Sequence, residues 1–166
     1  MSEPKTAVCP GSYDPVTNGH LDIITRTSAL FDRVVVGVVN QPIRKQKTAF
    51  SADERRAFIE EATSGLGNVE VVVFSNLVVE LAREVGATAI VKGLRAISDF
   101  EYESEMAQLN KKLDSGIESI YVFARPSFSF LSSTGVKEMA TFGADISDLV
   151  PAPVAAALAD RLERDR

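Results

Sequence analysis

The sequence predicts an α/β fold in which one domain is built on a doubly wound, five-stranded parallel sheet with helices on both faces. Short Val- and Ile-rich runs alternate with amphipathic segments along the chain, which is the pattern of a parallel sheet with crossover helices. The apolar runs show no strict alternation with polar residues, as expected for strands buried on both faces. The chain has 166 residues, the length of one domain, and no repeat or low-complexity linker divides it.

Five apolar runs are expected to form the strands. In chain order they are Thr6–Cys9, Arg33–Asn40, Val69–Phe74, Thr88–Lys92 and Ser119–Phe123. The segments between and after them predict helices over His20–Phe31, Ala52–Leu66, Val78–Val85, Asp99–Leu113, Ser133–Thr141 and about Ala152–Arg164.

The second and the last of these helices have the clearest sequence signals. Ser51 and Glu54 form a Ser-x-x-Glu capping box ahead of an apolar stripe that includes Phe58 and Ile59. Prolines at 151 and 153 break the chain before the C-terminal helix, whose apolar residues recur at helical spacing. We expect this helix, residues 152–164, to pack on a single domain that spans residues 1–166.

Composition narrows the possible ligands and surroundings. The net charge is −5, so no general positive field is available to hold a nucleic acid or an anionic membrane, and an anionic ligand has to be bound locally. Cys9 is the only cysteine, which excludes an internal disulfide or a cysteine-based zinc site and fits a reducing compartment. No apolar run reaches the length of a membrane span, and no signal peptide is evident. Cytoplasmic localisation is the expectation.

The segment after the first strand predicts a phosphate site. In a doubly wound, Rossmann-like sheet, ligands bind beyond the carboxyl ends of the strands where the strand order reverses. Residues 10–20 read PGSYDPVTNGH, a shaped turn that leads into a helix. Gly19 would let a phosphate approach the backbone at the helix start, and His20 would add a side-chain donor. A structural histidine is the alternative, but the Gly-His pair and its loop favour the anion site.

Cationic residues follow two further strands on the same rim of the sheet. Lys92 and Arg95 flank Gly93 and Leu94, where two cations can reach phosphates held over the first loop. A second cluster contains Arg44, Lys45 and Lys47, and any of these three could clamp a phosphate. For both groups the alternative is a solvated loop.

Two later segments add candidate contacts. The predicted helix over residues 99–113 carries acids early and lysines late, following the helix dipole, and one or two of its first acids are expected near the site. The hydroxyl-rich stretch at residues 128–135 leads into another helix, and either Ser132 or Ser133 could cap it or contact phosphate.

Several known catalytic and nucleotide-binding motifs are missing from the sequence. It has no P-loop, no dinucleotide-binding fingerprint and no nucleophile elbow. With one His and one Cys, no metal site within the protein is expected.

With these segments the chain resembles the bacterial phosphopantetheine adenylyltransferases. This family belongs to the nucleotidyltransferases that carry a Thr/His-x-Gly-His motif. The motif is Thr17-Asn18-Gly19-His20, and the PGSYDP, KGLR and DFEYE segments around residues 10–15, 92–95 and 99–103 narrow the match. Ser129-Phe130, Ser132-Ser133 and Val136-Lys137-Glu138 extend it, so that the similarity covers about residues 7–162.

This resemblance implies adenylyl transfer from ATP, with Mg²⁺ carried mainly by the phosphates, to 4′-phosphopantetheine, giving dephospho-coenzyme A in a homohexamer. His20, Lys92 and Arg95 would act in catalysis, with Lys92 on the acceptor phosphate. The nucleotide would contact Ser12, Tyr13, His20, Gly93, Leu94, Arg95, Glu103, Phe128, Ser129, Phe130, Leu131, Ser132, Ser133 and Thr134. The acceptor would contact Ser12, Arg44, Val78 and Lys92, with Leu77, Met106, Leu109, Asn110 and Glu138 around its arm unless these are ordinary core.

The chain departs from the family pattern mainly in the loop between Pro42 and Phe50, which is longer than usual. Which of Arg44, Lys45 and Lys47 serves as the acceptor-binding cation therefore stays open. Two other functions also stay open from the residues alone: transfer of an adenylyl or cytidylyl group to another phosphate acceptor, and ATP sensing without turnover.

Overall fold

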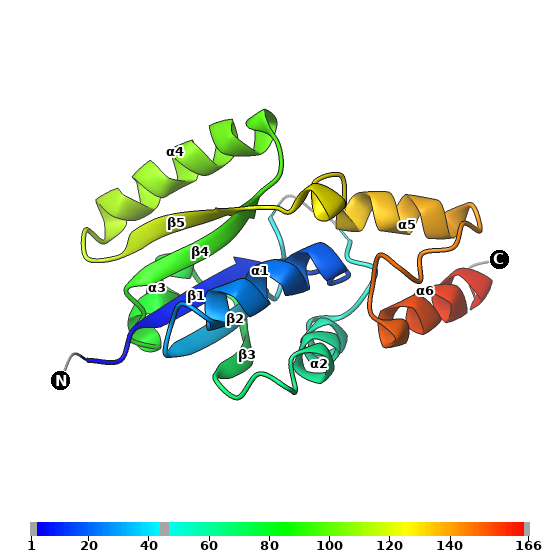
Figure 1. Ribbon diagram of the computed structural model, residues 1–166, viewed down its shortest axis with the longest axis horizontal. Coiled ribbons are helices and arrows are strands. Elements are labelled where there is room, and N and C mark those ends of the chain that lie inside the picture. The colour runs from blue at the N-terminus through cyan, green and yellow to red at the C-terminus, as the bar shows by residue number, and fades with distance from the viewer. Residues whose placement is uncertain (1–2, 44–46, 165–166) are drawn as a thin grey trace.

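The computed structural model describes residues 3–43 and 47–164, and a parallel five-stranded sheet forms its centre (Figure 1). The strands are β1 (Thr6–Gly11), β2 (Arg33–Val39), β3 (Val69–Phe74), β4 (Ala89–Leu94) and β5 (Glu118–Phe123). They lie in the order β3-β2-β1-β4-β5. The order reverses between β1 and β4, as in a doubly wound fold, and the predicted fold class is confirmed.

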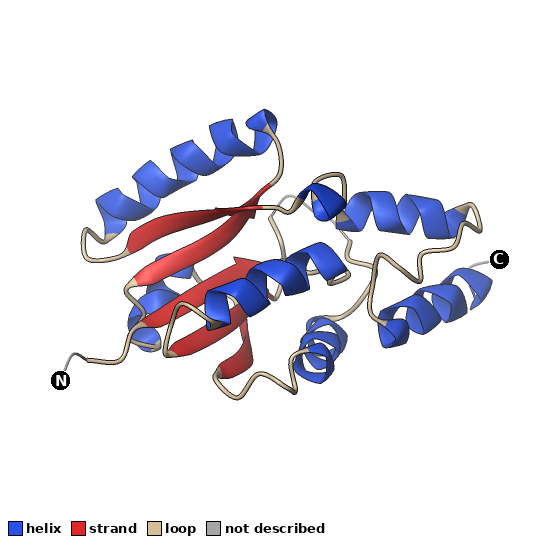
Figure 2. Cartoon of the chain, viewed as in Figure 1, coloured by secondary structure: helices blue, strands red, loops and turns tan. Residues whose placement is uncertain are grey.

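Helices cover both faces of the sheet (Figure 2). They are α1 (Asn18–Ser28), α2 (Ala52–Ala62), α3 (Val78–Glu84), α4 (Ile97–Leu113), α5 (Ser133–Thr141) and α6 (Ala152–Arg164), with a short 3₁₀ helix η1 at Pro126–Phe128. In Figure 1, α4 runs beside the edge strand β5, while α5 and α6 lie beyond the carboxyl ends of the strands. No helix in the described part of the chain is long and apolar enough to span a membrane.

The core has two layers because successive residues of a strand point to opposite faces. Cys9 and Val36 pack on the side of α1, α2, α5 and α6, where Ile24 is buried with them. Val8 and Val35 face α3 on the other side. Each fully buried Val or Ile side chain contributes about 1.5–3 kcal/mol relative to its exposed state, so both layers contribute to the stability of the sheet.

Several predicted boundaries were wrong. β1 continues to Gly11, because Pro10 and Gly11 pair with Gly37 and Val38 of β2. The second predicted helix ends at Ala62, four residues before Leu66, because the backbone of Thr63 leaves the helical region. The 3₁₀ helix η1 was not predicted.

The neighbouring strands β1 and β4 separate at their carboxyl ends, and this separation creates the space for a site. β1 pairs with β2 at six positions, from Thr6 to Gly11. Its ladder with β4 joins Ala7 with Ala89 and Val8 with Ile90. Beyond these pairs, the last residues of β1 and β4 face an opening instead of each other.

Candidate active site

A cavity of about 350 Å³ lies at the carboxyl ends of β1 and β4, a size typical of small-ligand sites. Its walls come from the end of β1 and the following loop, α1, the end of β4 with the start of α4, and the segment from η1 to α5. It brings together most of the predicted site residues: Ser12, Tyr13, His20, Lys92, Gly93, Arg95, Glu103, Phe128, Leu131, Ser132, Ser133 and Thr134.

The remaining predicted site residues are placed elsewhere. Among the described residues, Leu94, Ser129 and Phe130 lie close in sequence to the cavity walls but do not line them, and Val78 starts α3 outside the cavity. Arg44, like Lys45, lies outside the described residues. Ligand contacts of these side chains stay predictions.

The Thr17–His20 motif builds the start of α1. The helix was predicted to begin at His20, but it begins at Asn18, because Thr17 is its N-cap. The Thr17 hydroxyl accepts a hydrogen bond from the His20 backbone N–H at 3.3 Å, and the His20 ring Nδ1 accepts one from the Thr17 backbone N–H at 3.0 Å. The two residues thus form a capping box. Since Nδ1 is an acceptor, the proton of the neutral ring lies on Nε2.

Tyr13 supports the histidine from the other side of the loop. Its ring meets the His20 ring edge to face at a centroid distance of 5.1 Å. Its hydroxyl donates to the Cys9 carbonyl at 2.9 Å, and its backbone has a φ of 47°, a left-handed conformation that is uncommon for a residue with a side chain. Burial raises the pKa of Tyr13 well above its ordinary value, so the phenol keeps its proton.

The fourth strand was predicted to end at Lys92, with Gly93 in the loop after it. In the structure both residues lie within β4. The Lys92 ammonium pairs with the Glu103 carboxylate at 2.5 Å. Tyr121 of β5 donates to the Glu103 carbonyl at 2.9 Å. Burial and the nearby Glu103 raise the pKa of Tyr121 to about 12, so its hydroxyl remains a hydrogen-bond donor.

Gly93 allows a close approach of α1 to β4. A Cβ at this position would lie 3.0 Å from Ile23 of α1.

Arg95 is held in position by two contacts. Its Nε pairs with the Asp99 carboxylate at 3.2 Å, and a terminal nitrogen donates to the Leu131 carbonyl at 2.9 Å. The expectation that one or two early acids of α4 lie near the site is confirmed, since Asp99 and Glu103 both line the cavity. Each carboxylate pairs with one of the two cations, so the local charge is close to balanced.

The two serines at the start of α5 have different partners. Ser132 is the N-cap, and its hydroxyl accepts from the Gly135 backbone N–H at 3.0 Å. The Ser133 hydroxyl donates to the Pro15 carbonyl at 2.7 Å and so ties α5 to the loop after β1. Both residues also line the cavity, where the N–H groups at the helix start favour an anion.

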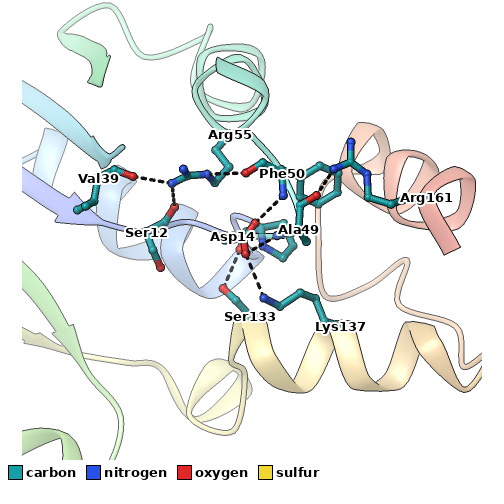
Figure 3. Close-up of polar contacts among 10 residues, drawn as sticks. Ser12, Asp14, Val39, Ala49, Phe50, Arg55, Ser133, Lys137 and Arg161 are labelled. Atoms are coloured by element: carbon teal, nitrogen blue, oxygen red, sulfur yellow. Dashed lines mark hydrogen bonds and ion pairs between the residues drawn. The ribbon is translucent and has the colours of Figure 1, made fainter. Parts of the chain in front are cut away.

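A polar network behind the cavity was missed in the sequence (Figure 3). Asp14 is fully buried, and its carboxylate accepts hydrogen bonds from the backbone N–H groups of Ala49 and Phe50 at 2.9 and 3.0 Å. The ammonium group of Lys137, in α5, forms an ion pair with the same carboxylate at 3.1 Å. A buried charge is stable in a fold when it is paired and hydrogen-bonded, and here that charge fixes the loop between Tyr13 and Pro15.

The side chain of Arg55, in α2, binds backbone carbonyl groups of the same loop and of neighbouring segments (Figure 3). It is 1% exposed and donates to the carbonyls of Ser12, Val39, Asn40 and Phe50 at 2.7–3.1 Å. Burial lowers its pKa while Asp14 opposes the shift, and an arginine remains charged in a protein. One signal could have revealed it: Arg55 lies on the apolar stripe of its helix, three and four residues before Phe58 and Ile59.

Comparison with known proteins identifies the family of the chain. The sequence profile of the family described as Cytidylyltransferase-like matches residues 8–139. A curated phosphopantetheine adenylyltransferase of Streptomyces coelicolor is 50% identical over 159 residues, which are 95% of this chain and 98% of that protein. A crystal structure from Vibrio parahaemolyticus, assigned as a nicotinate-nucleotide adenylyltransferase, superposes with a TM-score of 0.72 at 19% identity and covers 99% of this chain and 98% of its own. The last similarity concerns the fold alone. By its fold, its cavity and these matches, the chain belongs to the phosphopantetheine adenylyltransferases, within the cytidylyltransferase-like family.

Proposed function

We propose that the protein transfers an adenylyl group from ATP to 4′-phosphopantetheine, producing dephospho-coenzyme A and pyrophosphate in coenzyme A biosynthesis. The observation that carries the proposal is that His20, Lys92 and Arg95 line one cavity in a chain whose relative, 50% identical along nearly its whole length, is a phosphopantetheine adenylyltransferase.

The reaction is an in-line displacement at the α-phosphorus of ATP. An oxygen of the acceptor phosphate forms the new P–O bond, the bond from the α-phosphorus to the bridging oxygen breaks, and pyrophosphate leaves with those electrons. The attacking oxygen is already anionic, so no general base and no covalent intermediate is needed. The protein therefore contributes placement and stabilisation of charge.

Each polar wall of the cavity has a role in this scheme. His20 Nε2 donates to the phosphates of ATP and stabilises the charge that grows on the departing pyrophosphate. Arg95 binds the nucleotide phosphates, and Lys92 binds the acceptor phosphate. Lys92 pairs with Glu103 at 2.5 Å, so the acceptor phosphate has to compete with this carboxylate for the ammonium. The start of α5, whose residues Ser133 and Thr134 line the cavity, adds further backbone N–H donors.

Mg²⁺ enters the proposal as part of the ATP substrate. No group of three or more His, Cys, Asp or Glu side chains suited to a metal ion occurs among the described residues, and the two carboxylates that line the cavity are paired with Lys92 and Arg95. Mg²⁺ prefers phosphate and water oxygens in such sites. We therefore propose Mg²⁺–ATP as the form that binds.

The arm of the acceptor is proposed to lie toward α4 and the start of α3. The alternative, that these residues belong to the hydrophobic core, does not fit, because α4 has no buried residue and Leu77 and Leu109 are exposed. An apolar groove with a few polar groups suits the amides and thioalkyl end of pantetheine.

A homohexamer and a cytoplasmic location are proposed in addition. Ile97, Phe100 and Phe123 are exposed on and beside α4, and such a surface is typical of protein contacts. Light scattering on a sizing column would test the hexamer through its mass. Cell fractionation would test the location, for which the buried, unbridged Cys9 is the supporting observation.

The proposed reaction is tested by pyrophosphate release from ATP and Mg²⁺ with 4′-phosphopantetheine, nicotinamide mononucleotide or no acceptor in parallel. Release that requires phosphopantetheine is the expected result. Release with the other acceptor alone would overturn the acceptor assignment, and ATP binding without release in any reaction would indicate a sensor. His20→Ala protein purified in the same way controls for contaminating activity.

A further inference from the structure

Arg161, near the end of α6, makes contacts that are not explained by helix packing. Its guanidinium donates to the Ala49 carbonyl beside the Phe50 ring (Figure 3). It also pairs with Glu54 at 2.8 Å and lies 4.8 Å from the centre of the Phe50 ring. α6 is already anchored by Val154 and Leu158, which are buried in the core. Arg161 adds polar contacts with a different segment, residues 49–54.

The segment that Arg161 holds is the one that fixes Asp14. Ala49 and Phe50 present their backbone N–H groups to the Asp14 carboxylate at 2.9 and 3.0 Å. Arg161 grips the same two residues from the opposite side, through a carbonyl and an aromatic ring. It thereby limits how far these N–H groups can move from the carboxylate.

Asp14 in turn shapes the floor of the cavity. It lies next to Tyr13, which lines the cavity in a left-handed backbone conformation and contacts the His20 ring. The contacts therefore run from α6 through Ala49 and Phe50 to Asp14, and from there to Tyr13 and His20, which line the cavity.

We propose that Arg161 is a positioning residue for the adenylyl-transfer site. Through it, α6 sets the geometry of the loop between β1 and α1, residues 12–17, which we call the phosphate loop. Arg161 does not line the cavity, so it acts through the Ala49–Phe50 segment and not on the substrate. This inference rests on the proposed function for its kinetic consequence. Its structural part, the control of the loop by α6, does not depend on the reaction.

The test compares Arg161→Ala and Arg161→Lys with Arg83→Ala. Arg83 is a matched control because it too is partly exposed, pairs with a carboxylate (Asp114, 2.6 Å) and donates to a carbonyl (Leu113, 2.8 Å), but at the other end of the sheet. Arg161→Ala is expected to lower kcat about tenfold with a smaller change in the KM for ATP, since small misplacements of reacting groups cost up to about 10²-fold. Arg83→Ala should keep kcat within about twofold, because Arg83 does not line the cavity and an exposed ion pair contributes little even to stability.

Arg161→Lys should recover part of the lost rate, because it keeps the charge but cannot contact Ala49 and Glu54 as a fork. Hydrogen exchange gives the second measurement. Arg161→Ala should speed exchange of the amides at residues 10–18, and Arg83→Ala should not. Wild-type kcat in Arg161→Ala would overturn the positioning role, and unchanged exchange would overturn the contact chain. If wild-type protein is inactive with phosphopantetheine, the proposed function fails while the exchange comparison still decides the loop control.

Discussion

Replacing Asp14 by Asn tests whether the buried carboxylate holds the phosphate loop. The substitution keeps the shape of the side chain but removes its charge. Asp14 accepts two backbone hydrogen bonds, from Ala49 and Phe50, and pairs with Lys137. The single amide oxygen of Asn can serve one of those N–H groups, and its NH₂ group would face the other.

The expected loss of stability follows from these contacts. A buried donor left without an acceptor costs about 1–3 kcal/mol, and the remaining bond loses its charge assistance, about 1 kcal/mol more. Lys137 is 27% exposed, so water can solvate part of its unpaired charge. The sum is about 2–4 kcal/mol, or a fall in Tm of roughly 5–15 °C for a chain of this length.

Urea unfolding and calorimetry would measure this loss. Asp145→Asn is the control, since Asp145 is exposed and accepts one backbone N–H at 2.9 Å, from Ser147; its urea midpoint should stay close to wild type. We also expect kcat of Asp14→Asn to fall by at least about tenfold as the loop loosens. A Tm and kcat both equal to those of Asp145→Asn would refute the claim that Asp14 organises the site.

Four further outcomes are expected. His20→Ala should lower kcat by on the order of 10²–10³ with little change in ATP binding, the scale of one preorganised donor, and single-turnover kinetics would show an unchanged rate if the histidine has no role. Tyr13→Phe should cost about 1 kcal/mol in urea unfolding by removing the hydrogen bond to the Cys9 carbonyl; a stability equal to wild type would contradict that bond. Burial raises the pKa of Cys9 to about 12, so a thiol reagent at pH 8 should label it only after unfolding. The ordinary pKa of a cysteine thiol is about 9, whereas that of the buried Cys9 is about 12, so between these pH values the folded state keeps a proton that the unfolded state has lost. The free energy of unfolding should therefore decline as the pH rises from about 9 towards 12.

Much of the fold could be predicted because it rests on local sequence patterns. The five strands follow from uninterrupted Val- and Ile-rich runs, and the order of elements leaves few ways to arrange a parallel sheet. Boundaries were less accurate where tertiary pairing decides them. Pro10 and Gly11 are typical of turns, yet they extend β1 because β2 offers partners.

The residues that line the cavity were predicted more completely than the residues that support it. His20 and Lys92 were found through the motif and the position of their strands. Asp14 and Lys137, by contrast, are 123 positions apart in the chain, and no spacing pattern connects them. Arg161 and Ala49 meet across 112 positions and could not be paired for the same reason.

The sequence by itself determined the parallel α/β sheet, the location of the site at its carboxyl edge and the cations that face it. These depend on residue type and on periodicity along short stretches of chain. Only the tertiary structure decided which groups hold the loop after β1 in its shape: the amides of Ala49 and Phe50, the carboxylate of Asp14 and the guanidinium group of Arg55. The physical reason is that a buried charge or a backbone carbonyl takes its partner from whatever segment the packing brings within hydrogen-bond distance, and distance along the chain does not limit that choice.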